Sequence, residues 1–273
     1  MDTTCIDCGT CFHLAPDFFE EASDDRSYVK FQPRSGHEWL EAKRALISCP
    51  TNSIGVKNAP EEFKEAPIAL PLLISGNVYY CGYTSRDSFG ASTYFIVRSE
   101  GNVLIDSPRF NPALAREFEQ MGGIKTMILT HKDDVADHEL WARHFGCERV
   151  IHEDELDTYT AQVEKILAFN SPLVLDSEIT LIPTPGHTKG HITILYQNLY
   201  LFTGDHIFFD QQSGNLRASR NVCWYDWQQQ ILSTEKLLNF SFQWILPGHG
   251  GWCRFDGDKM KMAMQELLEG MKK

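Results

Sequence analysis

The sequence lacks an excess of basic charge. Its 273 residues include 25 Lys and Arg against 37 Asp and Glu, so the net charge is −12 with neutral histidine. A chain of this sign does not form the broad positive surface that follows a nucleic-acid backbone or an anionic membrane. We therefore expect no nucleic-acid and no membrane partner, although a local basic pocket is compatible with a small anionic ligand.

Long apolar runs and leader-like features are also missing. The most apolar stretch, residues 66–75, is interrupted by Pro67 and Pro71 and falls short of the roughly 20 residues that a membrane helix needs. The N-terminal residues reach a cysteine motif with no basic and apolar segment of a secretory signal before it, and with no Arg-rich transit peptide. We expect a cytoplasmic protein.

Cysteines are too few for a disulfide scaffold, since there are eight in the whole chain. In a reducing compartment, a spaced set of four indicates metal ligation. Cys5, Cys8 and Cys11 follow one another at intervals of three, and Cys49 stands before Pro50. A looping backbone with this spacing turns three sulfurs toward one inorganic cluster, and a distant Cys-Pro completes the set. The alternative is a zinc site, which usually has two separated Cys-x-x-Cys pairs; the spacing favours the cluster.

Residues 1–57 resemble the bacterial single-cluster ferredoxins. The resemblance rests on Cys-Ile-Asp-Cys-Gly-Thr-Cys at 5–11, Ala-Pro-Asp-Phe-Phe at 15–19 and Ser-Cys-Pro-Thr-Asn-Ser-Ile at 48–54. It implies one [4Fe–4S] cluster on the four cysteines, because a short helix predicted over 38–47 occupies the region of a second four-cysteine set. Such a cluster would be a one-electron carrier or a structural element.

The composition changes after the cysteine region. Residues 58–71 contain three prolines and several glutamates with little periodicity, as is typical of an exposed linker. We expect a ferredoxin-like domain over residues 1–60 and a second domain over 61–273. Strands and helices interleave through two halves of the second domain, which indicates a layered α/β architecture. Within it we predict a mostly helical segment over 153–169 and a long loop over 207–225.

Four loops after predicted strands contain imidazoles and carboxylates. They are Thr-His-Lys-Asp-Asp-Val-Ala-Asp-His at 130–138, Thr-Pro-Gly-His at 184–187, Thr-Gly-Asp at 203–205 and Pro-Gly-His at 247–249. Such side chains are the ligands that one or two Zn, Fe or Mn ions require, and an aspartate is able to bridge two ions. A lone histidine is more often a surface or core residue, but the order of the four motifs indicates a metal site.

In this order the motifs resemble the metallo-β-lactamase-fold superfamily over about residues 70–273. The resemblance implies a four-layer αβ/βα sandwich, so that the whole chain is of the α+β class with a small ferredoxin-like domain in front. It also implies three ligands from intact motifs. These are His187 in Thr-Pro-Gly-His, Asp205 as the bridging ligand in Gly-Asp, and His249 in Pro-Gly-His.

The first motif departs from the family pattern His-x-His-x-Asp-His. His131 is followed at the second ligand position by Asp133, and the Val-Ala pair at 135–136 has no metal-binding atoms. A carboxylate at the second position is chemically acceptable, more so for iron than for zinc. The alternative for the acidic residues of this motif is capping of a helix N-terminus and interaction with its dipole.

An insertion of two residues would restore the family's Asp-His pair as Asp137 and His138. One metal would then be held by His131, Asp133, His187 and Asp205, and the other would share Asp205 and add Asp137, His138 and His249. Without this restoration the site holds one metal or none.

The resemblance leaves three classes of function open. The first is a metal-dependent hydrolase of an ester, thioester or phosphoester on a small-molecule substrate, with Asp137 as the catalytic residue that orients or deprotonates water. The second is an oxidoreductase in which the cluster passes electrons to a non-haem iron site, similar in outline to the flavodiiron branch, with a redox partner protein. The third is a non-catalytic redox sensor with a degenerate metal site. We place the hydrolase first because the superfamily is mostly hydrolytic.

Overall fold

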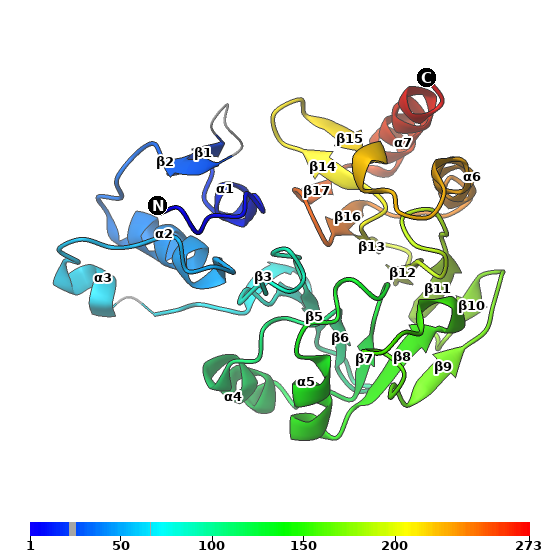
Figure 1. Cartoon of the computed structure of the whole chain (residues 1–273), viewed down its shortest axis with the longest axis horizontal. Coiled ribbons are helices and arrows are strands. Elements are labelled where there is room, and N and C mark those ends of the chain that lie inside the picture. The colour runs from blue at the N-terminus through cyan, green and yellow to red at the C-terminus, as the bar shows by residue number, and fades with distance from the viewer. Residues whose placement is uncertain (22–25, 66) are drawn as a thin grey trace. The chain divides into compact units, whose positions relative to one another are not determined.

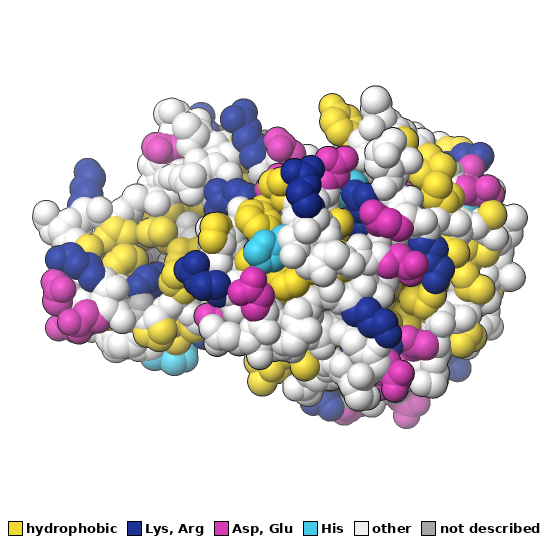
Figure 2. Space-filling view, turned by 90° about the horizontal axis from the view of Figure 1, so that it is seen from below, with side chains coloured by type: hydrophobic (Ala, Val, Ile, Leu, Met, Phe, Trp, Pro, Cys, Tyr) yellow, Lys and Arg dark blue, Asp and Glu magenta, His cyan; other side chains and the backbone are white. Residues whose placement is uncertain are grey.

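The computed structural model describes residues 1–21, 26–65 and 67–273, and Figure 1 labels the helices and strands of the chain. The described residues fall into two compact units. The first unit comprises Met1–Met127 and Asp134–Cys147, and the second comprises Ile128–Asp133 and Glu148–Lys273. Over the described ranges, every helix is too short or too polar to span a bilayer. Acidic and basic side chains are interspersed over the face that Figure 2 draws.

The first unit begins with a small cysteine-containing region. Its elements are α1 (Thr10–Leu14), β1 (Phe19–Glu21), β2 (Ser27–Val29) and α2 (Gly36–Ser48), with β1 and β2 antiparallel. The side chain of Ser35 accepts a hydrogen bond from the Glu38 N–H, while the Glu38 carboxylate accepts one from the Ser35 N–H. This reciprocal cap fixes the start of α2, and the predicted helix over 38–47 is confirmed within it. A small core forms beneath α2 from Cys11, Ala15, Phe18, Phe19, Ala45, Cys49 and Ile54.

A sheet and two helices make up the rest of the first unit. A short helix, α3 (Glu61–Glu65), lies inside the predicted linker. The sheet and the two helices that follow it are β3 (Leu72–Ser75), β4 (Val78–Tyr80), β5 (Tyr94–Ile96), β6 (Val103–Ile105), α4 (Pro112–Gln120) and α5 (His138–Phe145). Strands β3 to β6 pair in chain order, each antiparallel to the next. The ring of Phe118 in α4 stacks on Phe95 at 4.3 Å and lies 5.5 Å from Trp141 in α5. These buried rings hold both helices on the sheet.

The second unit is built around a six-stranded sheet. Its strands lie in the order β10 (Leu173–Val174), β11 (Ile179–Pro183), β12 (Ile192–Tyr196), β13 (Tyr200–Gly204), β16 (Trp244–Pro247) and β17 (Cys253–Arg254). All neighbours are antiparallel except β13 and β16, which are parallel. Two helices, α6 (Trp227–Leu237) and α7 (Gly257–Met271), bury apolar side chains against the sheet residues Ile182, Leu195, Leu201 and Ile245. Asp226 caps the start of α6, since its side chain accepts a hydrogen bond from the Gln229 N–H.

Two segments differ from the sequence-based expectation. The prediction of helix over 153–169 is wrong, because this stretch contains only a 3₁₀ turn (Glu153–Glu155) and β9 (Lys165–Leu167), which pairs in parallel with β8 (Glu148–His152). The carboxylate of Asp157 accepts hydrogen bonds from the N–H groups of Tyr159 and Thr160. Such local bonds compete with helical ones.

The second difference lies in the expected loop over 207–225. It contains an antiparallel hairpin of β14 (Phe208–Asp210) and β15 (Asn215–Arg217), followed by a 3₁₀ turn over Arg220–Val222. The buried Leu216 joins the core between the sheet and α7. Leu216 is the one buried residue of the two strands, with Phe209 partly buried beside the same core. This apolar pattern is too short to be read as a strand in advance.

Candidate functional site

The four cysteines of the first motif come together in the first unit. Cys11 lies in α1 and Cys49 directly after α2. Burial, followed by the negative charges of Cys8, Cys49 and Cys5, raises the pKa of the Cys11 thiol to about 12. The four sulfurs therefore lie within electrostatic range of one another, and none of them forms a disulfide.

Hydrogen-bonding groups lie beside two of these sulfurs. The Ser53 N–H donates to Cys49 Sγ at 3.3 Å, and Thr51 Oγ1 lies 3.7 Å from the same sulfur. Thr10 Oγ1 lies 3.3 Å from Cys8 Sγ. Thiolates that bind an iron–sulfur cluster accept such bonds, which adjust its reduction potential. Four convergent thiols with donors directed at the sulfurs fit a [4Fe–4S] cluster.

Five of the predicted metal ligands converge within the second unit. Each follows the end of a strand, and the five are His131 and Asp133 after β7 (Thr126–Ile128), His187 after β11, Asp205 after β13 and His249 after β16. Since β13 and β16 are parallel neighbours, their carboxyl ends meet at one edge of the sheet, which places Asp205 and His249 side by side.

One carboxylate oxygen lies at the centre of this group. Asp205 Oδ2 is 3.8 Å from His131 Nε2, 3.6 Å from His187 Nε2 and 3.6 Å from His249 Nε2. Asp133 Oδ2 lies 3.3 Å from His187 Nε2 and 4.0 Å from His131 Nε2. Two ligand atoms about 2.1 Å from a tetrahedral metal are about 3.4 Å apart. The separations therefore match those of ligands around a metal ion, and His131, Asp133 and His187 fit one ion together.

Two polar atoms of the site are buried without a hydrogen bond among the described residues. His131 Nε2 and Asp205 Oδ1 have no hydrogen-bond partner within the described parts of the chain. A buried polar atom of this kind costs about 1–3 kcal/mol, and coordination of a metal would satisfy it. Burial acts to raise the pKa of Asp205, but the imidazoles of His249, His131 and His187 outweigh it, so the pKa is lowered. A hydrogen bond from His187 lowers the pKa of Asp133. Both carboxylates are thus ionised, as metal ligation requires.

A row of hydrogen bonds behind the site orients two of the ligands. Thr130 Oγ1 lies 2.9 Å from His131 Nδ1, which directs Nε2 of that ring toward Asp205. The Asp205 N–H donates to His191 Nε2 at 3.2 Å, and His191 Nδ1 lies 3.0 Å from Thr184 Oγ1. Burial, followed by the charge of His131, holds the pKa of His191 far below its usual value. The neutral ring accepts at Nε2 and donates at Nδ1, an orienting role that the sequence did not reveal.

The glycine before Asp205 has no room for a side chain. Gly204 has φ +47°, and a Cβ there would lie 2.7 Å from His191 Nε2 and 2.8 Å from Thr130 Oγ1. The Gly-Asp motif therefore brings the backbone of β13 directly against the residues that orient the ligands.

Sequence analysis also missed Glu155, a fully buried residue. Its Oε2 accepts a hydrogen bond from the Lys132 N–H at 3.0 Å, and its Oε1 accepts one from the Gly190 N–H at 2.6 Å. One carboxylate thus joins the loop that contains His131 and Asp133 to the loop that follows His187. No pattern in the sequence marks a carboxylate whose partners are backbone groups.

Asp137 and His138 lie in the first unit. Asp137 has φ +54°, and its side chain makes no capping bond to α5. Instead, Asp137 Oδ2 accepts a hydrogen bond from the Phe110 N–H at 2.8 Å. His138 is the first residue of α5 and is buried. Their roles as ligands, and that of Asp137 as the catalytic residue, stay predictions.

Residues 86–267 match the family model of the metallo-beta-lactamase superfamily. The chain belongs to this superfamily. Residues 1–56 match the 4Fe-4S single cluster domain of ferredoxin I, so the lactamase domain shares its chain with a cluster domain. Both predicted resemblances are confirmed, as is the α/β sandwich; the domain boundary at residue 60 stays a prediction.

Two relatives of this superfamily member have names that denote hydrolases. A probable metallo-hydrolase of Methanocaldococcus jannaschii is 29% identical over 212 residues, which is 66% of this chain and 95% of the relative. The hydroxyacylglutathione hydrolase of Shewanella pealeana is 29% identical over 152 residues, 50% of this chain and 51% of that enzyme. The chain therefore matches about half the length of the second relative.

Solved structures of the superfamily share the fold. The metallo-beta-lactamase FIM-1 of Pseudomonas aeruginosa, in its mono-zinc form, aligns with a TM-score of 0.54 at 19% identity and covers 72% of this chain and 93% of its own. The metallo-beta-lactamase of Pontibacter korlensis aligns with a TM-score of 0.55 at 19% identity, covering 73% and 97%. At this identity the likeness concerns the fold alone. A superfamily fold that binds one or two metal ions accords with the convergent ligands found here.

Proposed function

We propose that this lactamase-fold chain is a metal-dependent hydrolase of a small-molecule ester, thioester or phosphoester. The observation that supports it most is the convergence of three imidazole Nε2 atoms, from His131, His187 and His249, on Asp205 Oδ2 at 3.6–3.8 Å. The hydrolase names of the two relatives support the same class of reaction.

Five residues of the second unit would hold the metal: His131, Asp133, His187, Asp205 and His249. One or two Zn, Fe or Mn ions bound there would polarise a carbonyl or phosphoryl oxygen and make water more acidic. Asp137 is proposed to orient that water and take its proton, and with His138 it would complete a two-metal site. His191 and Glu155 act as positioning residues, because they hold the backbone beside the ligands.

An exposed aromatic side chain lies beside one of the candidate metal ligands. The N–H groups of Trp224 and Tyr225 both donate to the carbonyl oxygen of His187, at 2.9 and 3.0 Å. The Trp224 ring lies 6.2 Å from the His187 ring and is largely exposed. An exposed aromatic ring beside a metal ligand suits contact with an apolar part of a substrate.

One observation favours an oxidoreductase as the second candidate. Asp133 stands where the family has an imidazole, and its Oδ2 lies 3.3 Å from His187 Nε2. An anionic oxygen ligand shifts the preference of a site toward harder ions such as iron and manganese. With a cluster domain in the same chain, a redox partner protein would reduce the cluster, and the cluster would pass electrons to such a site.

A single experiment separates the two candidates. Anaerobically purified protein is assayed on a panel of thioesters, carboxyl esters and phosphoesters, with the cluster first oxidised and then reduced. Hydrolysis that Asp205→Ala abolishes, and that is equal in both redox states, supports the hydrolase. Rapid reoxidation of the reduced protein by oxygen, lost in Asp205→Ala and unaccompanied by turnover of any ester, would defeat it in favour of the oxidoreductase.

A further inference from the structure

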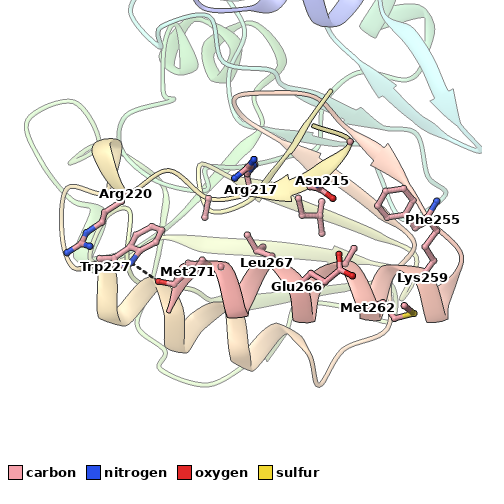
Figure 3. Close-up of a pocket in the computed structure, with 15 residues that line it drawn as sticks. Asn215, Arg217, Arg220, Trp227, Phe255, Lys259, Met262, Glu266, Leu267 and Met271 are labelled. Carbon is pink, nitrogen blue, oxygen red and sulfur yellow. Dashed lines mark hydrogen bonds between the residues drawn. The ribbon is translucent and has the colours of Figure 1, made fainter. Parts of the chain in front are cut away.

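A cavity of about 530 Å³ runs along one face of α7 in the second unit (Figure 3). Its floor includes Ala263, Leu267 and Met271 of α7, and the buried Leu216 of β15 lies opposite them. None of the candidate metal ligands lines this cavity. Its volume is within the range of about 300–1,000 Å³ that is common for small-molecule sites, so it is a second place where the chain is able to hold a ligand.

Aromatic rings stand at the two ends of the cavity. Trp227 of α6 lies at one end, where its Nε1–H donates to the carbonyl oxygen of Met271 at 3.2 Å. Phe255 lies toward the other end, near the start of α7 (Figure 3). The α7 side of the lining between them follows about three turns of helix, which is roughly 16 Å at 1.5 Å per residue. It is apolar at Leu267 and Met271, and the Glu266 carboxylate lies nearer the Phe255 end (Figure 3). The hollow is therefore elongated, and it suits an extended apolar chain better than a compact ring system.

The rim of the cavity is positive, in contrast to the acidic chain as a whole. Arg217, Arg220 and Lys259 line it, with Glu266 as the single acidic lining residue. Part of this charge is already engaged, because Arg217 Nε lies 3.7 Å from Asp210 Oδ2. The remaining surplus suits a ligand with one negative charge, not a polyanion such as a nucleotide.

We propose that this cavity binds an acyl carboxylate, with the alkyl chain along the apolar part of the lining and the carboxylate toward the guanidinium group of Arg220. Burial of the chain supplies most of the affinity, and the arginine sets its direction and selects the charged headgroup. The inference does not depend on the hydrolase proposal, because the lining residues and the candidate metal ligands are different side chains.

Gly270 provides a test that separates ligand binding from folding. It lines the cavity, and a Cβ built on it meets nothing within 4 Å. Gly270→Leu would fill the hollow while improving helix propensity. The matched control is Gly257→Leu, also in α7 and also in open space but outside the lining. A charge pair completes the set: Arg220→Gln removes a rim cation, and Lys261→Gln removes an exposed lysine of α7 that does not line the cavity.

The full chain is titrated with sodium dodecanoate and with the neutral dodecanol by calorimetry, before and after chelation of weakly held metal. We expect dodecanoate to bind the wild type, the Gly257→Leu and the Lys261→Gln proteins equally, with and without chelator. Gly270→Leu and Arg220→Gln should each weaken binding at least tenfold, and melting temperatures should show that both variants are folded.

Three results would overturn the proposal. They are absence of dodecanoate binding to the wild type, equal binding to Gly270→Leu, and equal affinity for dodecanol and dodecanoate. A parallel arm uses phosphatidylglycerol vesicles: sedimentation with vesicles that Gly270→Leu abolishes, without binding of free dodecanoate, would assign the cavity to a lipid surface instead. Failure of the hydrolase proposal would appear only in the esterase assay, so the two outcomes are distinguishable.

Discussion

Gly90 packs directly against the cluster cysteine Cys8. A Cβ on Gly90 would lie 2.6 Å from Cys8 Cβ and 2.8 Å from Cys8 Sγ, and the residue has φ +84°. Thr10 Oγ1 also donates a hydrogen bond to the Gly90 carbonyl oxygen at 3.2 Å. Within the first unit, the cysteine loop and the loop before β5 are therefore one close-packed piece, although 80 residues separate them in the sequence.

The same loop also reaches the irregular first histidine motif. The Ala136 N–H donates to Ser88 Oγ at 3.4 Å, three residues after Asp133 in the sequence. Ser107 Oγ donates to the Ala136 carbonyl oxygen. Contacts within the first unit thus lead from Cys8 through Gly90 and Ser88 to Ala136, in the segment that departs from the family pattern.

Gly90→Ala should lower both cluster content and thermal stability. The added methyl group meets Cys8, and the backbone is in a region that only glycine adopts easily, so we expect a loss of about 1–3 kcal/mol. The measurements are acid-labile sulfide per chain and the melting temperature. Gly55→Ala is the control, because a Cβ there meets nothing within 4 Å. Equal cluster content in the two variants would show that the contact with Cys8 is unimportant.

Cys49→Ser should abolish the broad visible absorption of the iron–sulfur cluster. Cys49 Sγ accepts a hydrogen bond from the Ser53 N–H, and its charge acts on the Cys11 thiol, so a serine oxygen would remove a thiolate from a set of four. Cys81→Ser is the comparison, since that buried thiol lies outside the motif. Wild-type protein that contains zinc and no labile sulfide would overturn the assignment of the cluster.

Asp205→Ala should reduce the non-cluster metal content to near zero. Asp205 Oδ2 lies 3.6–3.8 Å from the Nε2 atoms of His131, His187 and His249, so its loss removes a negative charge that all three imidazoles face. Element analysis beside acid-labile sulfide separates this metal from cluster iron. His37→Ala serves as the control, because His37 is an exposed residue of α2. A loss of metal in His37→Ala with none in Asp205→Ala would place the site elsewhere.

Five of the candidate metal ligands could be located from the sequence because each stands in a short motif just after a strand. The cysteine spacing and the Gly-His and Gly-Asp strings of His187, Asp205 and His249 are local patterns of this kind. The residues that position them are not, since Glu155 bonds to backbone N–H groups 23 and 35 residues away. Almost every residue type has a backbone N–H, so only the folded chain reveals which N–H groups this carboxylate contacts. The prediction of a helix over 153–169 fails for a related reason, because the turn at Asp157 depends on hydrogen bonds from backbone N–H groups to its side chain.

Glu155→Gln tests whether the buried carboxylate positions the metal ligands. Both oxygens of Glu155 accept hydrogen bonds from backbone N–H groups, those of Lys132 and Gly190. A glutamine amide has only one acceptor oxygen, so its NH₂ group would face one of these two N–H donors across 3 Å or less. One buried hydrogen bond would be lost, at a cost of about 1–3 kcal/mol. Residues that orient metal ligands typically alter metal affinity by about 10–100-fold when they are replaced.

We therefore expect Glu155→Gln to weaken metal binding about tenfold or more, measured by competition with a chromophoric chelator, while the cluster absorption stays at the wild-type level. Glu153→Gln is the matched control, because it makes the same change at an exposed residue of the same 3₁₀ turn. If both variants bind metal as the wild type does, the carboxylate supports only the fold. If both lose the metal equally, the effect comes from the charge of the turn, since the two variants share only the loss of one negative charge there.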